Sequence, residues 1–120
     1  MNASRWRRVR VRPPYDDIAA LNRLIHEPAR LAIVTVLGSC EKADFVFMVN
    51  ITGLTKGNLS SHASKLQQAG IIEIEKVFEG SYPVTYFKLT GEGRERLEEY
   101  WNRFDNIRQI VRAQKASPAV

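Results

Sequence analysis

The fold is decided by the stretch ADFVFMVNITGLTKGNLSSHASKLQQAGIIEIEKVFEGSYPVTYFKL, which runs from Ala43 to Leu89. Its centre predicts a helix over Lys56–Ala69. Thr55 can accept a hydrogen bond from the free amides of the first turn, and Gly70 can adopt the left-handed conformation that ends a helix. The strongest local signals of the chain therefore flank one helix.

This predicted helix has an apolar and a polar face. Leu59, Ala63 and Leu66 recur at helical spacing and are expected to face the interior. Small hydroxyl side chains on the other face would let the helix lie close to a duplex, and Lys and Gln can reach phosphates or base edges. An ordinary solvated surface helix has the same composition. The neighbouring segments must therefore show whether this helix belongs to a DNA-binding motif. The outward residues are Lys56, Gly57, Ser60, Ser61, Ser64, Lys65 and Gln68.

The preceding segment predicts a second short helix. Asp44 can cap it, and Phe45, Val49 and either Thr52 or Met48 form its inner stripe. Gly53 and Leu54 then make a tight, partly buried turn. Two short helices joined by a Gly-containing turn are typical of a helix-turn-helix.

The following segment predicts a β-hairpin. Apolar and polar residues alternate along IIEIEKVF and along VTYFKL, as expected for two antiparallel strands. Residues 79–83, EGSYP, fill the connection. The hairpin tip is expected to project from the domain as a wing.

The sequence resembles the winged helix-turn-helix transcriptional regulators of the MarR and ArsR superfamily, in particular its small MarR-like DNA-binding domains. The resemblance covers about Asp17 to Trp101 and lies in HEPARLAIVTVL, GLTKGNLSSHASKLQQAGIIEIEK and YFKLTGEGRERLEEYW. It implies a mainly α fold with a small β-hairpin (α+β), an extra N-terminal helix and a long C-terminal helix. It also implies that the Lys56–Ala69 helix enters the major groove and that the hairpin touches the adjacent backbone or minor groove. The implied contacts of the helix are Thr55, Lys56, Asn58, Ser60, Ser61, Ser64 and Lys65, and Gln68 extends the same face.

The wing departs from the family pattern, in which the tip commonly carries Arg or Lys. Here Glu79 is expected to face phosphates and repel them. Either Ser81, Tyr82 and backbone amides make the contact, or the wing contributes little affinity. The flanking Lys76 and Lys88 would compensate in part.

The charge is unevenly distributed. The chain of 120 residues carries a net charge of +5, and five arginines within residues 1–12 account for the excess, because 13 basic and 13 acidic side chains remain from Pro13 onward. We expect an Arg-rich disordered arm over residues 1–14, which either follows DNA phosphates or only solubilises the chain.

The other expected segments are a winged-helix domain over 15–90, a C-terminal helix over 91–116 and a tail over 117–120. No apolar run is long enough to span a membrane and the start does not resemble a secretory signal, so the predicted location is cytoplasmic.

The terminal segments predict helices. Upstream, Ile18, Leu21 and either Leu24 or Ile25 form one stripe of a helix over Asp17–Ile25, and a buried helix from Pro28 to Gly38 follows. Downstream, one helix is expected over Gly91–Lys115. At about 1.5 Å per residue its length is about 37 Å, more than so small a domain can cover. Its apolar stripe either packs on the N-terminal helix or, as we favour, forms the seam of a homodimer. The seam residues are Leu97, Tyr100, Trp101, Phe104, Ile107 and Val111.

Little in the sequence favours an enzyme. Neither of its two histidines, His26 and His62, belongs to a recognisable arrangement of a catalytic nucleophile with a general base. Cys40 is the single cysteine. We therefore predict no catalytic residues, no metal site and no cofactor. A small-molecule effector is possible, and the sequence does not identify one. The predicted function is sequence-specific binding of double-stranded DNA by a homodimeric transcriptional regulator. The alternative is a winged helix used for protein contacts, which the neutral domain and the acidic wing would suit.

Overall fold

The computed structural model describes residues 14–19 and 21–115. The predicted arm, apart from Pro14, and the predicted tail lie outside these residues. The chain divides into two compact units, one formed by Asn22–Glu98 and the other by the described residues up to Leu21 and from Glu99 onward. The elements are α2 (Pro14–Ala19), α3 (Pro28–Gly38), β1 (Ala43–Asp44), α4 (Phe45–Thr52), α5 (Lys56–Gln68), β2 (Ile72–Glu79), β3 (Tyr82–Leu89) and α6 (Gly91–Lys115).

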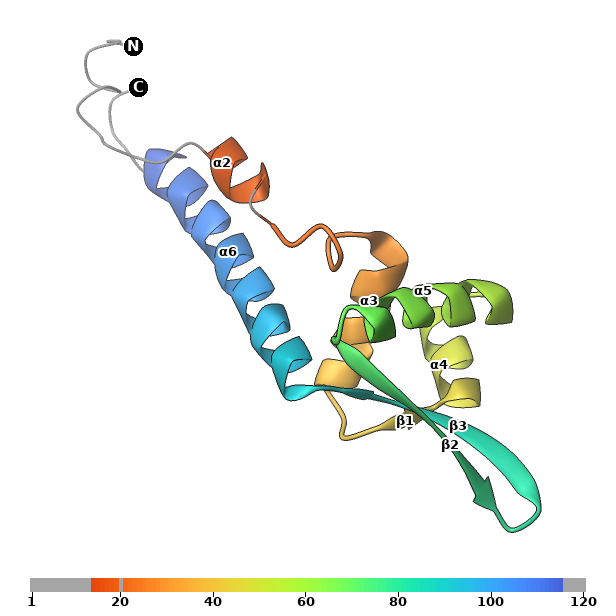
Figure 1. Cartoon of the computed structure of the whole chain (residues 1–120). Helices are drawn as coiled ribbons and strands as arrows, with labels where there is room; N and C mark the ends of the chain where they lie inside the picture. The colour runs from red at the N-terminus through yellow and green to blue at the C-terminus, as the bar shows by residue number, and fades with distance from the viewer. Residues whose placement is uncertain (1–13, 20, 116–120) are drawn as a thin grey trace. The chain divides into compact units, whose positions relative to one another are not determined.

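The unit Asn22–Glu98 is a winged helix. Helices α3, α4 and α5 gather at one end of the β2–β3 hairpin, and the other end of the hairpin projects beyond them (Figure 1). The predicted fold class, mainly α with a small antiparallel sheet, is confirmed.

The core of this unit lies between the three helices and the base of the sheet. The predicted inner stripe of α5 is confirmed, since its side chains are fully buried. In α4 it is Met48, one of the two alternatives, that is fully buried. The large, fully buried side chains of this unit are Ile25, Ile33, Val34, Leu37, Met48, Leu59, Leu66, Ile71, Ile72, Phe87 and Leu89.

Side-chain caps fix the helix starts, as the sequence predicts. The Phe47 amide donates to the Asp44 carboxylate over 2.8 Å at the start of α4. The Asn58 amide donates to Thr55 Oγ1 over 3.1 Å at the start of α5. These caps satisfy amides that a helix leaves free, and they set the angle at which α5 leaves the turn.

The sheet has three strands rather than the two that the sequence predicts. β3 lies in the centre, with β2 on one side and the two-residue β1 on the other, all antiparallel. β1 is too short to show alternation, so no sequence pattern marks it. The hairpin tip is also tighter than predicted, because β2 and β3 extend to Glu79 and Tyr82 and leave only Gly80 and Ser81 in the turn. Gly80 has φ 65°, which a tight two-residue turn favours at this position.

The predicted helix over Asp17–Ile25 is wrong in its extent. α2 ends at Ala19, and turns occupy residues 23–25. The Asn22 side chain accepts hydrogen bonds from the Leu24 amide over 3.0 Å and from the Ile25 amide over 3.4 Å. Asn side chains that bind nearby amides in this way compete with helical hydrogen bonding. Consequently the expected apolar stripe is broken.

α6 spans Gly91–Lys115 without interruption, the range predicted from its periodicity. Thr90 begins it, since its hydroxyl accepts a hydrogen bond from the Gly93 amide over 2.9 Å. None of the helices in the described part of the chain has the length and apolar character that crossing a membrane requires.

Candidate nucleic-acid interface

The outward face of α5 is open to solvent. Of the predicted contacts only Ser64 is half-buried, and Thr55, whose hydroxyl oxygen caps the helix, is itself exposed. The small side chains of Ser60 and Ser61 lie on this face beside longer ones such as Lys65, so part of the helix can approach a groove closely. The exposed predicted contacts on α5 are Lys56, Asn58, Ser60, Ser61, Lys65 and Gln68.

His62 of α5 is tied to the start of α3. Its Nδ1 lies 3.2 Å from Arg30 Nη1 and 3.7 Å from Glu27 Oε2. Glu27 in turn accepts hydrogen bonds from the Ala29 and Arg30 amides. Burial by itself raises the pKa of Glu27, but these amides, His62 and Arg30 hold it below its ordinary value. His62 therefore has a supporting role, fixing α5 against α3 beneath the exposed face.

The β2–β3 ladder gives the hairpin two different faces, since successive side chains alternate. The helix face, which continues from the core, carries Ile72, Ile74, Lys76, Phe78, Pro83, Thr85, Phe87 and Leu89. The glutamate face, on the opposite side, carries Glu73, Glu75, Val77, Glu79, Tyr82, Val84, Tyr86 and Lys88. All three acidic residues of the hairpin lie on the glutamate face.

The helix face and α5 share a cleft of about 250 Å³. Ser60 of α5, Lys76 of β2 and Thr85 of β3 give it hydroxyl and ammonium groups. No carboxylate is among its lining residues, which also include Phe45, Ala63, Ile74 and Phe87. A lysine and two hydroxyl groups in one cleft, without an acidic residue in the lining, suit a phosphate group.

Glu79, which we expect to repel phosphates, does not line the cleft. Glu79 lies on the glutamate face, where it accepts a hydrogen bond from Tyr86 Oη. This hydrogen bond, together with burial and the charges of Glu79 and Asp44, raises the pKa of Tyr86 above its ordinary value. The Lys42 ammonium lies 4.3 Å from the centre of the Tyr86 ring. Glu79 of the wing thus has a hydrogen-bond partner, Tyr86, on the face of the hairpin away from the cleft.

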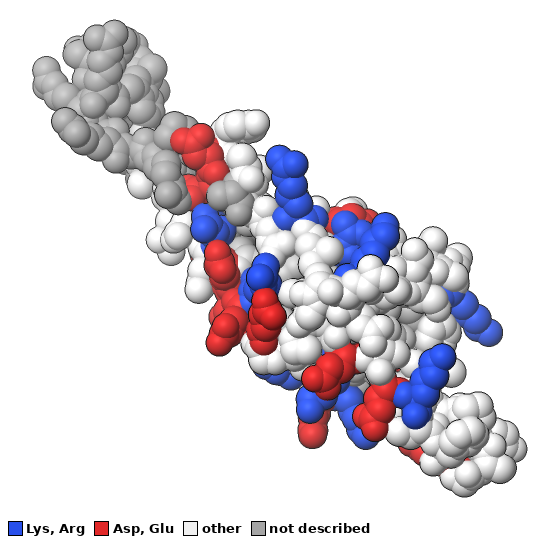
Figure 2. Space-filling model, viewed as in Figure 1, with Lys and Arg blue, Asp and Glu red and all other residues white. Residues whose placement is uncertain are grey.

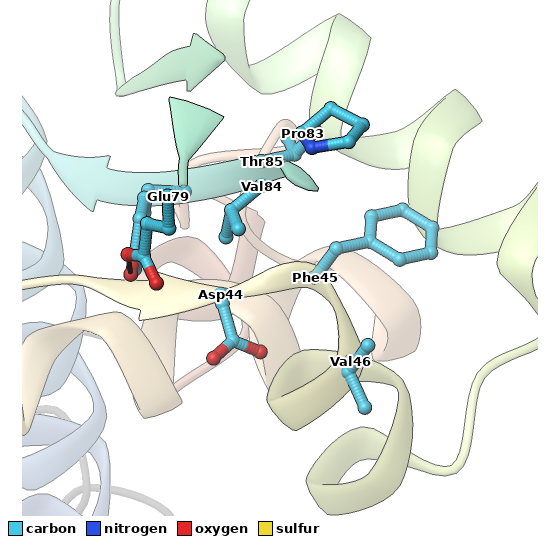
Figure 3. A pocket seen from close by; sticks show the side chains of 8 residues that line it. Asp44, Phe45, Val46, Glu79, Pro83, Val84 and Thr85 are labelled. Carbon is cyan, nitrogen blue, oxygen red and sulfur yellow. Dashed lines mark hydrogen bonds between the residues drawn. The ribbon is translucent and has the colours of Figure 1, made fainter. Parts of the chain in front are cut away.

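A second hollow, of about 490 Å³, lies between the start of α4 and the outer part of the hairpin. In Figure 3 the Pro83 ring and the Glu79 side chain leave the hairpin in different directions. Asp44 and Glu79 give this hollow two carboxylates, which disfavour a phosphate. We therefore place the candidate DNA surface on α5 and the helix face.

Charge alone does not mark this surface. In Figure 2 basic and acidic side chains are interspersed, and the hairpin tip is mostly uncharged. The sequence agrees, since no Lys or Arg occurs from Val77 to Phe87. The sequence prediction named Ser81 and Tyr82 at the tip; both are exposed, and Tyr82 lies on the glutamate face.

Comparison with known proteins identifies the family. Residues 29–111 match the family described as Winged helix DNA-binding domain. The chain is 28% identical over 78 residues to the uncharacterized protein MJ0432 of Methanocaldococcus jannaschii, covering 65% of this chain and 85% of that protein.

Solved structures share the fold. A transcriptional regulator homologue protein from Pyrococcus horikoshii OT3 superposes with a TM-score of 0.68 and 26% identity, over 84% of this chain and 96% of that one. A protein from Enterococcus faecalis V583, assigned to the MarR family of transcriptional regulators, gives a TM-score of 0.69 at 14% identity, over 91% of this chain and 98% of that one. Family and fold are those of transcriptional regulators, which are not enzymes. The chain belongs to the winged helix DNA-binding domain family and is a DNA-binding transcriptional regulator with the fold of MarR-family proteins.

Proposed function

We propose that the protein binds double-stranded DNA sequence-specifically as a homodimer, with α5 in the major groove and the hairpin along the flanking backbone. The observation that carries this proposal is the cleft between α5 and the helix face, whose lining includes Ser60, Lys76 and Thr85 and no carboxylate. A DNA strand that leaves the groove occupied by α5 would pass the hairpin on this side. We expect the protein to act in the cytoplasm, with its DNA partner.

The proposed contacts on α5 divide by chemistry. Lys56 and Lys65 carry point charges that suit phosphates, which fix position without reading sequence. Asn58 and Ser61 have short side chains that can donate and accept hydrogen bonds at base edges. Affinity and sequence preference would therefore depend on different residues of the same face.

The second unit supplies the argument for a homodimer. Its described residues are α2, Leu21 and the part of α6 from Glu99 onward, and several of its large apolar side chains on α6 remain exposed. Tyr100 is buried, whereas Trp101, Phe104 and Val111 remain 38%, 36% and 50% exposed. We propose that these three residues and Ile107 pack against a second copy about a two-fold axis. Two copies of α5 would then read two half-sites of an inverted repeat.

Lys65→Ala is expected to weaken duplex binding for all sequences and to reduce the slope of log K against log salt by about one unit, because one phosphate contact is lost. Ser61→Ala should instead change the preferred sequence. Both effects can be measured by fluorescence anisotropy titrations at several salt concentrations, with a selection from random duplexes for sequence preference. If folded variants of both kinds bind as the parent does, α5 is not the DNA-facing helix.

Lys76 and Lys88 form a matched pair that tests the cleft. Both are exposed lysines of the hairpin, on opposite faces. We expect Lys76→Ala to lower affinity about threefold to tenfold at low salt, as the loss of one phosphate contact would, and Lys88→Ala to leave it nearly unchanged. The same titrations measure both. An equal loss in both variants would show that the DNA does not discriminate between the two faces.

A further inference from the structure

Two apolar side chains end the helix face of the wing. Phe78 of β2 is paired with Pro83 of β3, and both are exposed. Phe78 keeps 76% of its surface accessible, which is unusual for a ring of this size. The described residues thus leave an aromatic ring uncovered at the outer end of the surface that continues from the cleft.

The tip has no cation with which to bind DNA. Residues 77–87 contain no Lys or Arg, and the one acid of the tip, Glu79, lies on the glutamate face with Tyr86 as its partner. The helix face beyond Lys76 is consequently uncharged and apolar. Such a surface can approach DNA without repulsion, but it can contribute only through packing.

The spacing along β2 fits a groove. Lys76 lines the cleft beside α5, and Phe78 lies two residues farther out on the same face. Two residues of a strand span about 7 Å, and the minor groove of B-DNA is about 6 Å wide. If the Lys76 ammonium binds a phosphate at the edge of the minor groove, this spacing would bring Phe78 to the groove.

We propose that Phe78, backed by Pro83, enters the minor groove as an apolar wedge, partly unstacks one base step and bends the duplex. This inference rests on the proposed function, because it requires α5 to be in the adjacent major groove. Apolar wedges of Phe or Pro act in this way in minor-groove binding proteins, and flexible pyrimidine–purine steps bend most readily. The tight turn at Gly80 and the hydrogen bond from Tyr86 to Glu79 hold the strands that present the wedge. The wing would therefore read deformability rather than base edges.

Tyr82 offers a matched control for Phe78. It is 75% exposed and also aromatic, but it lies on the glutamate face. Both residues protrude into solvent, so we expect Phe78→Ala and Tyr82→Ala to fold as the parent does, which circular dichroism and thermal melting would verify.

The test uses a duplex selected by the parent protein from a random pool, labelled with a fluorophore pair at its ends so that energy transfer reports bending. We expect the parent to bend it. Phe78→Ala should remove most of the bend and lower affinity about tenfold, in the range of one lost aromatic contact with a base. Tyr82→Ala should retain both. Replacing the pyrimidine–purine step under the wing by a stiff step should weaken the parent and leave Phe78→Ala unaffected.

The outcomes separate the two proposals. If the parent selects no duplex, the proposed function fails. If the parent binds a selected duplex without bending it, or if Phe78→Ala bends it as the parent does, only the wedge is refuted. A loss of self-association rather than of bending in Phe78→Ala would make the tip a protein contact and would also refute the wedge.

Discussion

Gly93→Ala is expected to destabilise the protein by about 3 kcal/mol, near the upper end of the range for overpacked sites. Gly93 is buried in the first turn of α6. A Cβ added there would lie inside the contact distance of the Ile71 carbonyl oxygen, 3.0 Å from its carbon and 3.2 Å from Thr90 Oγ1. The clash cannot be relieved by a side-chain rotation because it involves backbone. The same carbonyl accepts hydrogen bonds from the Thr90 amide and hydroxyl, which join the end of β3 to the start of β2.

Gly91→Ala is the matched control for this prediction. It places the same substitution two residues earlier in the same helix, where an added Cβ would meet nothing within 4 Å. Because Ala favours a helix over Gly by up to about 1 kcal/mol, this variant should be as stable as the parent or slightly more stable. Urea unfolding followed by circular dichroism measures both changes. Equal stability of the two variants would mean that the contact between α6 and Ile71 is looser than the structure indicates.

The parts of the fold that sequence predicts well are those specified locally. Thr55 caps the start of α5, and Gly70, with φ 78°, follows its end. The helix runs over Lys56–Gln68, so its last residue lies one position before the predicted Ala69. The start of α4 depends on the Asp44 cap in the same way. A cap, a period of 3.6 and a stop signal within one segment leave little for tertiary contacts to change.

The N-terminal segment shows where this reasoning fails. The spacing of Leu21 and Ile25 suits a helix, and both residues are buried, but a run of turns buries them instead. The carboxamide of Asn22 binds two amides that a helix would have used. Periodicity records which residues are buried, and it cannot distinguish these two ways of burying them.

The two faces of the wing depend on the register of its strands. The alternation of Ile and Glu along IIEIEKVF predicts a strand, and the same phase carried four residues beyond Ile74 and Glu75 places Phe78 on the side of Ile72 and Ile74 and Glu79 on the other side. The sequence predicts a contact at Tyr82, whereas the ladder puts Phe78, and not Tyr82, on the same face as Lys76. Only the pairing of β2 with β3 shows which exposed residues of the hairpin lie on the side of α5.

Phe104→Glu is expected to convert the homodimer that we propose into a monomer. Phe104 is 36% exposed and its ring centre lies 5.7 Å from that of Tyr100 and 6.3 Å from that of Trp101. A carboxylate at this position in an apolar seam would have to be desolvated without a partner, and the two-fold axis would introduce it twice. Leu97, the first residue of the predicted seam, is 8% exposed and packs beside Gly38 within one chain, so the proposed seam begins at Trp101.

The functional consequence would be larger than the loss of any single DNA contact. Linking two half-site modules raises affinity by about 100-fold to 10,000-fold, so a monomeric variant should lose about that much on an inverted repeat while binding a single half-site as the parent's subunit does. Asn106→Glu adds the same charge to an exposed position two residues along α6, away from the Phe104 stripe, and should leave the dimer intact. Sedimentation velocity at tens of micromolar and titrations on half-site and inverted-repeat duplexes measure both effects. A parent protein that sediments as a monomer would refute the seam, and the half-site affinity of α5 would then have to account for all specific binding.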